Sequence, residues 1–361
     1  MIPLVKVSMP PREILLPALE EVLYSGMVAE GEYVYRFEKA FGEYFGLPNL
    51  LSQSSGTAAL HTALTLAGVG PGSEVVSTPM TAEPTNMAIL YSGAKVVWAD
   101  VNSENGTLDP DSVRDAITPK TKAIMIVHYA GYPTDMESIM KIAAEKSIPV
   151  IEDCAHSLGA MYDGKPIGTM GDYSIFSFQA IKHFTTVDGG AISIKDDKRI
   201  DEAKRFRWFG MLKGVSRTEV DIESIGYKYN MSNVTAAIGL TQLKVVDSVL
   251  SRHIANGRYY DEKFSSISGF APARFDIKAS PSYWVYTLLC DDAAGAERIL
   301  KEHEVIASKL HKPNNRHSIF SGSARKLPGL DRFYSRLLHI PCGWWVTDDD
   351  RAMIVDALAR G

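Results

Sequence analysis

A single lysine lies in the segment "SFQAIKHFTTVDGG", which runs from Ser177 to Gly190. Lys182 stands between an alternating apolar stretch and a pair of glycines, where a strand is expected to turn into a packed loop. Burying an ammonium group costs free energy unless the group is paired or its pKa falls. A partly desolvated lysine loses its proton more easily and becomes a nucleophile toward aldehydes. The position therefore predicts a reactive amine.

A second candidate segment is "VIEDCAHSLGA", from Val150 to Ala160. Asp153 closes an expected buried strand, and His156 follows three residues later, so the two side chains are candidates for one pocket. A buried carboxylate is costly unless it meets a cation or several hydrogen-bond donors. Asp153 thus either caps the element that follows, which is a common structural role, or meets a ligand cation.

A third segment, "SSGTAAL" from Ser54, opens an expected helix with small and hydroxyl residues. The N–H groups of Gly56 and Thr57 and the positive end of the helix dipole suit a phosphate, although a plain helix cap has the same sequence. A phosphate site, a buried carboxylate and a reactive lysine are together what pyridoxal phosphate (PLP) needs. Lys182 would form the Schiff base, Asp153 would pair with the pyridinium nitrogen, and Ser177 would add a hydroxyl to the phosphate.

These segments must be positioned by alternating strands and helices. Short apolar runs predict strands at 74–78, 95–101, 122–128 and 149–153, and helical patterns lie between them at 57–68, 109–117 and 135–147. Buried strands separated by helices predict a mostly parallel sheet covered on both faces. Ligands bind at the carboxyl ends of such strands, where Asp100, His128 and Asp153 stand. A long helical stretch, 232–264, is expected to lead to a strand at 283–290 and further helices.

Length and composition limit the classes of protein. The 361 residues predict two domains, a large one over 1–245 and a smaller α+β one over 246–361. The net charge of −5 argues against nucleic acid or an anionic membrane as the main partner. The apolar runs are too short to span a bilayer, and the N-terminus does not resemble a signal peptide. The three cysteines are far apart, so we expect no metal site or disulfide and a cytoplasmic location.

The sequence resembles the DegT/DnrJ/EryC1/StrS family of sugar aminotransferases, which have the fold-type-I architecture of PLP enzymes. The resemblance rests on motifs in family order from about Ser25 to Leu243. They are "SSGTAAL", "GAKVVWADV", "LDPDSVRDAITPKTKAIMIVHYAGYPTDM", "VIEDCAHSLGA", "GDYSIFSFQAIKHFTTVDGGAISI" and "GYKYNMSNVTAAIGLTQL". The lysine segment is the most specific of these.

The resemblance implies roles for individual residues. Lys182 would bond the cofactor and move the proton, and Asp153 would keep the pyridinium nitrogen protonated. His156 would lie beside the cofactor ring. The implied phosphate-binding residues are Gly56, Thr57 and Ser177. The family is dimeric, and each site borrows a loop from the partner, here "GYKYNMSN".

Two positions depart from the family pattern. Ala82, in "PMTAEP", replaces an aromatic residue that stacks on the cofactor ring. Lys228 replaces an asparagine of the borrowed loop that contacts the phosphate. Both changes leave the contacts to the cofactor at these positions open.

The resemblance implies transfer of an amino group, with L-glutamate as the expected donor, to a nucleotide-linked keto sugar. Deoxyaminosugar synthesis for a surface polysaccharide such as O-antigen, or for a secondary metabolite, is the expected setting. One alternative is a sugar dehydratase of the same family, in which histidine replaces the Schiff-base lysine; another is a non-catalytic regulatory relative. His317 and Trp344 are further candidates for contact with the sugar nucleotide, whose sugar, base and aminated carbon the motifs do not specify.

Overall fold

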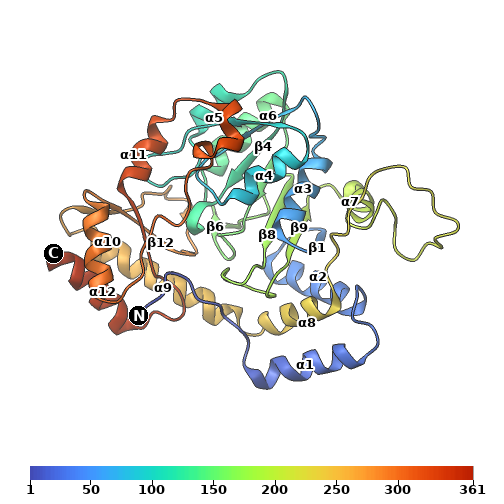
Figure 1. Ribbon diagram of the computed structural model, residues 1–361, viewed down its shortest axis with the longest axis horizontal. Helices are drawn as coiled ribbons and strands as arrows, with labels where there is room; N and C mark the ends of the chain where they lie inside the picture. The colour runs from blue at the N-terminus through green and yellow to red at the C-terminus, as the bar shows by residue number, and fades with distance from the viewer. Residues whose placement is uncertain (361) are drawn as a thin grey trace.

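A seven-stranded sheet forms the centre of the protein in the computed structural model, which describes residues 1–360 (Figure 1). The strands lie, in spatial order, as β1 (Leu50–Gln53), β9 (Gly190–Ile194), β8 (Tyr173–Ser177), β5 (Val150–Asp153), β4 (Thr121–Val127), β2 (Glu74–Ser77) and β3 (Lys95–Trp98). Strands β8, β5, β4, β2 and β3 pair in parallel, whereas β9 runs antiparallel to both of its neighbours. The expected mostly parallel sheet is confirmed.

Helices cover both faces of this sheet. They are α2 (Glu32–Phe45), α3 (Gly56–Leu66), α4 (Glu83–Tyr91), α5 (Pro110–Ala116), α6 (Met136–Lys146) and α8 (Asn233–Gln242). One apolar core contains side chains of α3 and α4, and a second core contains those of α2, α5, α6 and α8. Adjacent strand residues point into different cores, as Val75 and Val76 of β2 do. Two more helices, α1 (Arg12–Tyr24) and α7 (Ile200–Phe206), pack on α8 and α3 respectively.

The last third of the chain forms a smaller antiparallel sheet with its own helices. Its strands are β10 (Phe270–Pro272), β12 (Tyr286–Cys290) and β13 (Leu337–Ile340), and its helices are α9 (Val246–Phe264), α10 (Ala293–Glu302), α11 (Pro328–Arg336) and α12 (Asp348–Arg360). A ribbon of three two-residue strands contains β6 (Met161–Tyr162), β7 (Lys165–Pro166) and β11 (Ala279–Ser280). Short 3₁₀ turns are η1 (Tyr129–Gly131), η2 (Asp197–Arg199), η3 (Asn314–Arg316) and η4 (Ser318–Ser323).

The expected single helical stretch at 232–264 is wrong in one respect. It consists of α8 and α9, which meet at an angle of 58°. The predicted domain boundary at 245/246 falls at this bend, but the first residues of the chain pack on the C-terminal part. Ile2 pairs with Val305, and Trp345 Nε1 donates a hydrogen bond to the carbonyl of Pro3 at 2.9 Å. The division into 1–245 and 246–361 therefore stays a prediction.

The loop that joins α7 to α8, residues 207–232, projects from the body of the protein (right side of Figure 1). The loop carries exposed apolar side chains, among them Ile222, Ile225 and, where it packs on Phe206 of α7, Tyr227. Within residues 1–360, no single helix is both long and apolar enough to cross a membrane; only the bent α8–α9 pair passes such a test by length and composition.

Candidate active site

A cavity of about 430 Å³ opens at the carboxyl ends of the parallel strands. Its wall brings together six residues that the sequence predicted to bind a cofactor: Gly56, Thr57, Asp153, His156, Ser177 and Lys182. Two other predicted strand-end residues have structural roles. The Asp100 carboxylate accepts the N–H groups of Gly329 and Leu330, each at 2.8 Å, and His128 bonds to Glu152 behind the cavity.

Asp153 ends β5 and is only 3 % exposed. Its carboxylate accepts hydrogen bonds from Thr85 Oγ1 at 2.8 Å and from the N–H of Ala155 at 3.0 Å. No helix begins directly after it, so it caps a turn and not a helix. Burial raises the pKa of Asp153, and the two hydrogen bonds and Lys182 only partly oppose this. A cationic ligand atom in the cavity would favour the ionised form of this carboxylate.

Lys182 follows β8 by a short loop and borders the cavity. Burial lowers the pKa of Lys182 to about 7, and the charge of Asp153 opposes this shift. A substantial fraction of the amine is therefore unprotonated near neutral pH, where an ordinary lysine is almost fully charged. The sequence prediction of a reactive amine agrees with this environment.

The His156 imidazole is buried against Trp284, in the segment just before β12. Its ring stacks on Trp284 with centroids 4.1 Å apart and an angle of 17° between the planes. The N–H of Ala130 donates to its Nδ1 at 3.4 Å, which leaves Nε2 to carry the ring proton. Burial, with a smaller effect of Lys182, lowers the pKa of His156 well below its ordinary value, so the ring is neutral.

The N-terminus of α3 lies against the end of β8. Ser55 caps the helix by accepting the N–H of Ala58 at 3.0 Å, and the first-turn N–H groups of Gly56 and Thr57 have no intrahelical acceptor. A Cβ at Gly56 would lie 3.0 Å from the Cβ of Ser177, so glycine permits this close approach. The helix end and the Ser177 hydroxyl together form a site suited to an anion.

The comparisons with known proteins agree with this geometry. The model of the DegT/DnrJ/EryC1/StrS aminotransferase family matches residues 12–359. The chain belongs to this family. GDP-perosamine synthase of Escherichia coli is 36% identical over 78% of this chain and 75% of its own length. The UDP-4-amino-4,6-dideoxy-N-acetyl-β-L-altrosamine transaminase of Campylobacter jejuni is 31% identical over 96% and 93%.

The fold of this aminotransferase is also similar to those of solved structures. The sugar aminotransferase CalS13 of Micromonospora echinospora superposes with a TM-score of 0.96 at 36% identity, over 100% of both chains. A Streptococcus pneumoniae protein solved in its PLP form has a TM-score of 0.90 at 25% identity, over 99% of this chain and 98% of its own. The expected family, fold-type-I architecture and PLP dependence are confirmed, and the protein is a PLP-dependent sugar aminotransferase.

The residues around the cavity fit this cofactor. Asp153 is a buried carboxylate on the cavity wall, and no cationic side chain forms an ion pair with it among residues 1–360. It would suit a protonated pyridine nitrogen. The α3 N-terminus and Ser177 would hold the phosphate, and Lys182 has the lowered pKa that bonding to an aldehyde requires. PLP supplies an electron sink and a carrier for the amino group when it is bound.

The two departures from the family pattern have different surroundings. Ala82 lies in the cavity wall, at the start of α4, as its sequence position predicted. Lys228 is exposed on the projecting loop and does not border the cavity of its own chain, as far as residues 1–360 describe it. The next residue reaches the α3 segment, because the carbonyl of Tyr229 accepts the N–H of Ser54 at 2.5 Å.

Trp284 and His311 are among the cavity residues that sequence reasoning missed. Trp284 stood in an expected strand at 283–290, but β12 begins at Tyr286, so the tryptophan belongs to the segment before it. His311 lies six residues before His317, the candidate sugar contact. Burial, followed by Lys182, lowers the pKa of His311 to about 4, and its Nδ1 has no hydrogen-bond partner in the described part of the chain.

The two proposed sugar contacts differ in position. His317 Nε2 lies 3.7 Å from the Glu83 carboxylate, which borders the cavity. Trp344 packs under the Lys6 ammonium, 5.2 Å from its ring centroid, and is not a lining residue within 1–360. Trp344 therefore stays a structural residue in this arrangement.

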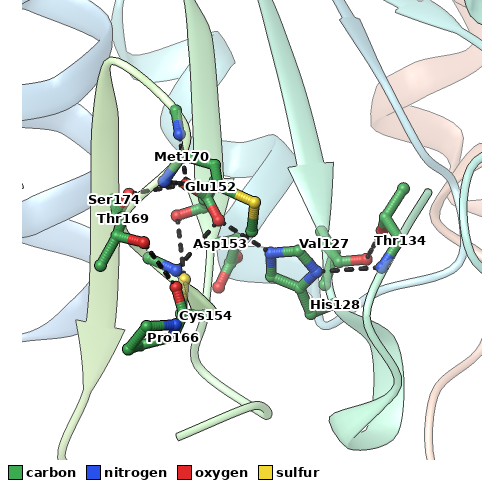
Figure 2. A network of polar contacts seen from close by, with 12 residues as sticks. Val127, His128, Thr134, Glu152, Asp153, Cys154, Pro166, Thr169, Met170 and Ser174 are labelled. Atoms are coloured by element: carbon green, nitrogen blue, oxygen red, sulfur yellow. Dashed lines mark hydrogen bonds and ion pairs between the residues drawn. The ribbon is translucent and has the colours of Figure 1, made fainter. Parts of the chain in front are cut away.

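A second polar cluster lies behind Asp153 (Figure 2). The ligand atoms of His128, Glu152 and Cys154 lie within 4.8 Å of one another, a grouping that suits a metal. The Glu152 carboxylate, however, already accepts bonds from the backbone of Gly168 and Met170, each at 3.0 Å, and from His128 Nε2 at 3.1 Å. Burial tends to raise the pKa of Glu152, but these donors outweigh it and lower the pKa. The cluster fastens the loop before β8 to the strand that carries Asp153.

Proposed function

We propose that the protein transfers an amino group from L-glutamate to a keto group of a nucleotide-linked sugar, in the synthesis of a deoxyaminosugar. The observation that carries the proposal is the lowered pKa of Lys182 in a cavity that also holds Asp153 and the anion site at α3. The nucleotide-sugar enzymes that match this chain over most of its length support the substrate class. The spore coat polysaccharide biosynthesis protein SpsC of Bacillus subtilis, 32% identical over 94% of this chain and 92% of its own length, supports a polysaccharide setting. O-antigen as that polysaccharide stays a prediction.

The side chains have distinct roles in this proposal. The neutral Lys182 amine would bond to the aldehyde carbon of the cofactor with loss of water, and once released its Nζ would carry a proton between the donor carbon and the cofactor. Asp153 keeps the pyridine nitrogen protonated. His156 is a neutral donor through Nε2 beside the cofactor ring. Gly56, Thr57 and Ser177 bind the phosphate.

The dehydratase alternative requires a histidine in place of the lysine. His183 is the histidine nearest in sequence, but its Nε2 bonds to the carbonyl of Ser282 at 3.1 Å and its ring packs on His253. His183 is therefore engaged away from the cavity, and Lys182 is the amine that borders it. A regulatory protein without catalysis has no need for Lys182, Asp153 and Ser177 around one cavity, which disfavours the second alternative.

The proposal includes a homodimer whose sites are shared. The projecting loop exposes Ile222, Ile225 and Tyr227 beside the exposed Lys228, and such an apolar surface favours a partner. A second copy of this chain is the occupant that the family pattern implies. Lys228 would then reach the cofactor phosphate of the partner's site. The cytoplasmic location expected from the sequence stays a prediction.

The test begins with the purified enzyme loaded with PLP. L-Glutamate added without a sugar should convert the visible absorption of the lysine-bound cofactor to that of the aminated cofactor, with 2-oxoglutarate released in equal amount. A panel of nucleotide-linked keto sugars should then regenerate the first spectrum and yield an aminosugar detectable by mass spectrometry. Loss of a sugar hydroxyl without gain of nitrogen would support the dehydratase, and no spectral change with any amino acid would support the regulatory relative.

A further inference from the structure

Trp284 joins three parts of the site. It is 1 % exposed and lies between β11 and β12 in the C-terminal part of the chain. Its indole ring stacks on His156, and the Lys182 Nζ lies 3.9 Å from the ring centroid. Its Nε1–H donates to the carbonyl of Ile181, the residue before the lysine, at 2.8 Å. One side chain thus contacts the reactive ammonium and holds the backbone beside it.

The backbone fixes Trp284 in this position. His183 Nε2 bonds to the Ser282 carbonyl at 3.1 Å, so residues on both sides of Lys182 are tied to the segment 282–284. Gly131 lies against the same segment and has a φ of +96°. A Cβ at this residue would come within 2.7 Å of the backbone nitrogen of Trp284. The close approach that only glycine permits sets the distance between Trp284 and the strand ends.

The charged groups around Lys182 provide one anion for its ammonium, so an aromatic ring can add to the stabilisation of this ammonium. Titratable groups near its amine come from β5 and the turn after it, the lysine loop, α4 and the segment before η3. They are Asp153, His156, His183, Asp188, Glu83 and His311. Burial lowers the pKa of each of the three histidines, so they are neutral at pH 7. Asp153 is the anion that acts on the lysine, and a protonated cofactor nitrogen would engage that charge. An aromatic face attracts an ammonium group but not a neutral amine, and it adds no charge.

We propose that Trp284 is a positioning residue that holds the Lys182 ammonium whenever this side chain is not bonded to the cofactor. Its ring stabilises the protonated amine without competing with the cofactor nitrogen. The inference rests on the proposed function, because the glutamate half-reaction releases Lys182 and requires it to gain and lose a proton. Trp284 acts through the lysine and through the stacked His156.

The test measures the pKa of Lys182 in the full-length chain without cofactor, where the amine is free. Competitive acetylation by acetic anhydride across pH, with mass spectrometry of the peptide that contains Lys182, gives the pKa directly. Trp284→Leu and Trp284→Phe both remove the bond to Ile181, but only phenylalanine keeps an aromatic face. We expect the pKa to fall by about 0.5–1 unit in Trp284→Leu, a three- to tenfold loss of proton affinity, and by about half as much in Trp284→Phe.

Trp344→Leu is the matched control. Trp344 also carries a lysine ammonium on its ring, that of Lys6 at 5.2 Å, but it lies outside the cavity lining. This variant should leave the pKa of Lys182 unchanged. Equal values for the leucine and phenylalanine variants of Trp284, or a rise toward 10 in either, would show packing or water entry and overturn the proposal.

A second readout tests the proposal even if the Trp284→Leu chain does not fold. In the PLP-loaded enzyme, the basic limb of the pH profile for the glutamate half-reaction should move in the same direction in Trp284→Phe as the pKa of the free amine. An unmoved profile contradicts the inference. The labelling measurement needs no sugar substrate, so its result does not depend on the proposed substrate class. Failure of the proposed function and failure of the Trp284 inference can therefore be told apart.

Discussion

The strand-end side of the cavity and the C-terminal side are built in different ways. Asp153, Ser177 and Lys182 lie at the ends of neighbouring parallel strands or directly after them, so local sequence places their chemistry. Trp284 and His311 come from segments that are more than a hundred residues later and have no strand-end signal. Long-range hydrogen bonds of Trp284, and of Asn314 three residues after His311, hold these segments there. The comparison indicates that cofactor chemistry is encoded locally, whereas the wall that surrounds it depends on tertiary contacts.

A buried amide pair shows how the C-terminal side is held. Asn86 Nδ2 donates to Asn314 Oδ1 at 2.8 Å, and Asn314 Nδ2 donates to the carbonyl of Thr81 at 2.9 Å. Both asparagines are fully buried. Their bonds clamp the segment before Ala82 to the loop that carries His311, which lies three residues before Asn314. This part of the cavity wall is therefore fixed by polar contacts between residues distant in sequence, which no local sequence pattern predicts.

Removing the lysine amine should have the largest effect on the strand-end side. Lys182→Ala takes away both the nucleophile and the proton carrier, and His183 is engaged elsewhere. The visible band of the lysine-bound cofactor should vanish and turnover should fall by at least about a thousandfold. Stopped-flow spectra and product assays measure both. Near-wild-type turnover in this variant would place the reactive amine at another residue.

Asp153→Asn tests the charge next to that amine at constant size. The pyridine nitrogen should lose its proton, so we expect the cofactor to remain bound while the glutamate half-reaction slows on the order of a hundredfold or more. Single-turnover spectra measure the rate, and equilibrium titration measures cofactor affinity. An unchanged half-reaction rate would mean that the carboxylate does not face the cofactor nitrogen.

Lys228→Ala tests whether the site extends across the dimer. A hydrogen bond from a charged group is worth about 1.5–3 kcal/mol, so cofactor affinity should fall by about ten- to a hundredfold. Arg217→Ala removes an exposed charge from the same projecting loop and should change cofactor affinity little. Equal losses in both variants would indicate a general effect of loop charge.

The same variant allows a complementation measurement. A dimer of one Lys182→Ala chain and one Lys228→Ala chain has one site with both lysines altered and one with both intact, if Lys228 acts in trans. Activity of the mixture should exceed that of either variant alone. No recovery, with subunit exchange verified by mass spectrometry, would exclude action in trans.

The smallest effect is expected from the C-terminal clamp. Asn314→Ala leaves buried amide and carbonyl groups without their partner, which should lower the free energy of unfolding by about 1–3 kcal/mol. The KM for the sugar substrate should rise, because the loop with His311 is released, while the glutamate half-reaction stays close to that of wild type. Urea unfolding and steady-state kinetics measure the two effects. If the glutamate half-reaction slows by the same factor as the KM for the sugar rises, the two sides of the cavity do not act independently.

Sequence patterns were sufficient for the elements that local periodicity specifies. The strands expected at 74–78 and 122–128 are β2 and β4 within one residue at each end. Thr347 and Asp350 form a capping box before α12, which has a local sequence signature. The bend between α8 and α9 was missed because helical periodicity continues through it. Asp100 and Asp153 occupy equivalent strand ends in sequence. Only the neighbours across space decide that Asp100 binds backbone N–H groups and Asp153 faces the cavity.

The sequence by itself predicted the reactive lysine, the carboxylate and the anion site, because each prediction depends on residue type at the end of a strand or the start of a helix. The tertiary structure decided the pKa of Lys182, since burial lowers it and the approach of Asp153 opposes this shift, and both depend on segments distant in sequence. It also decided which histidines face the cavity. All four of these histidines have the same side chain, and His156 and His311 differ from His128 and His183 in their spatial neighbours.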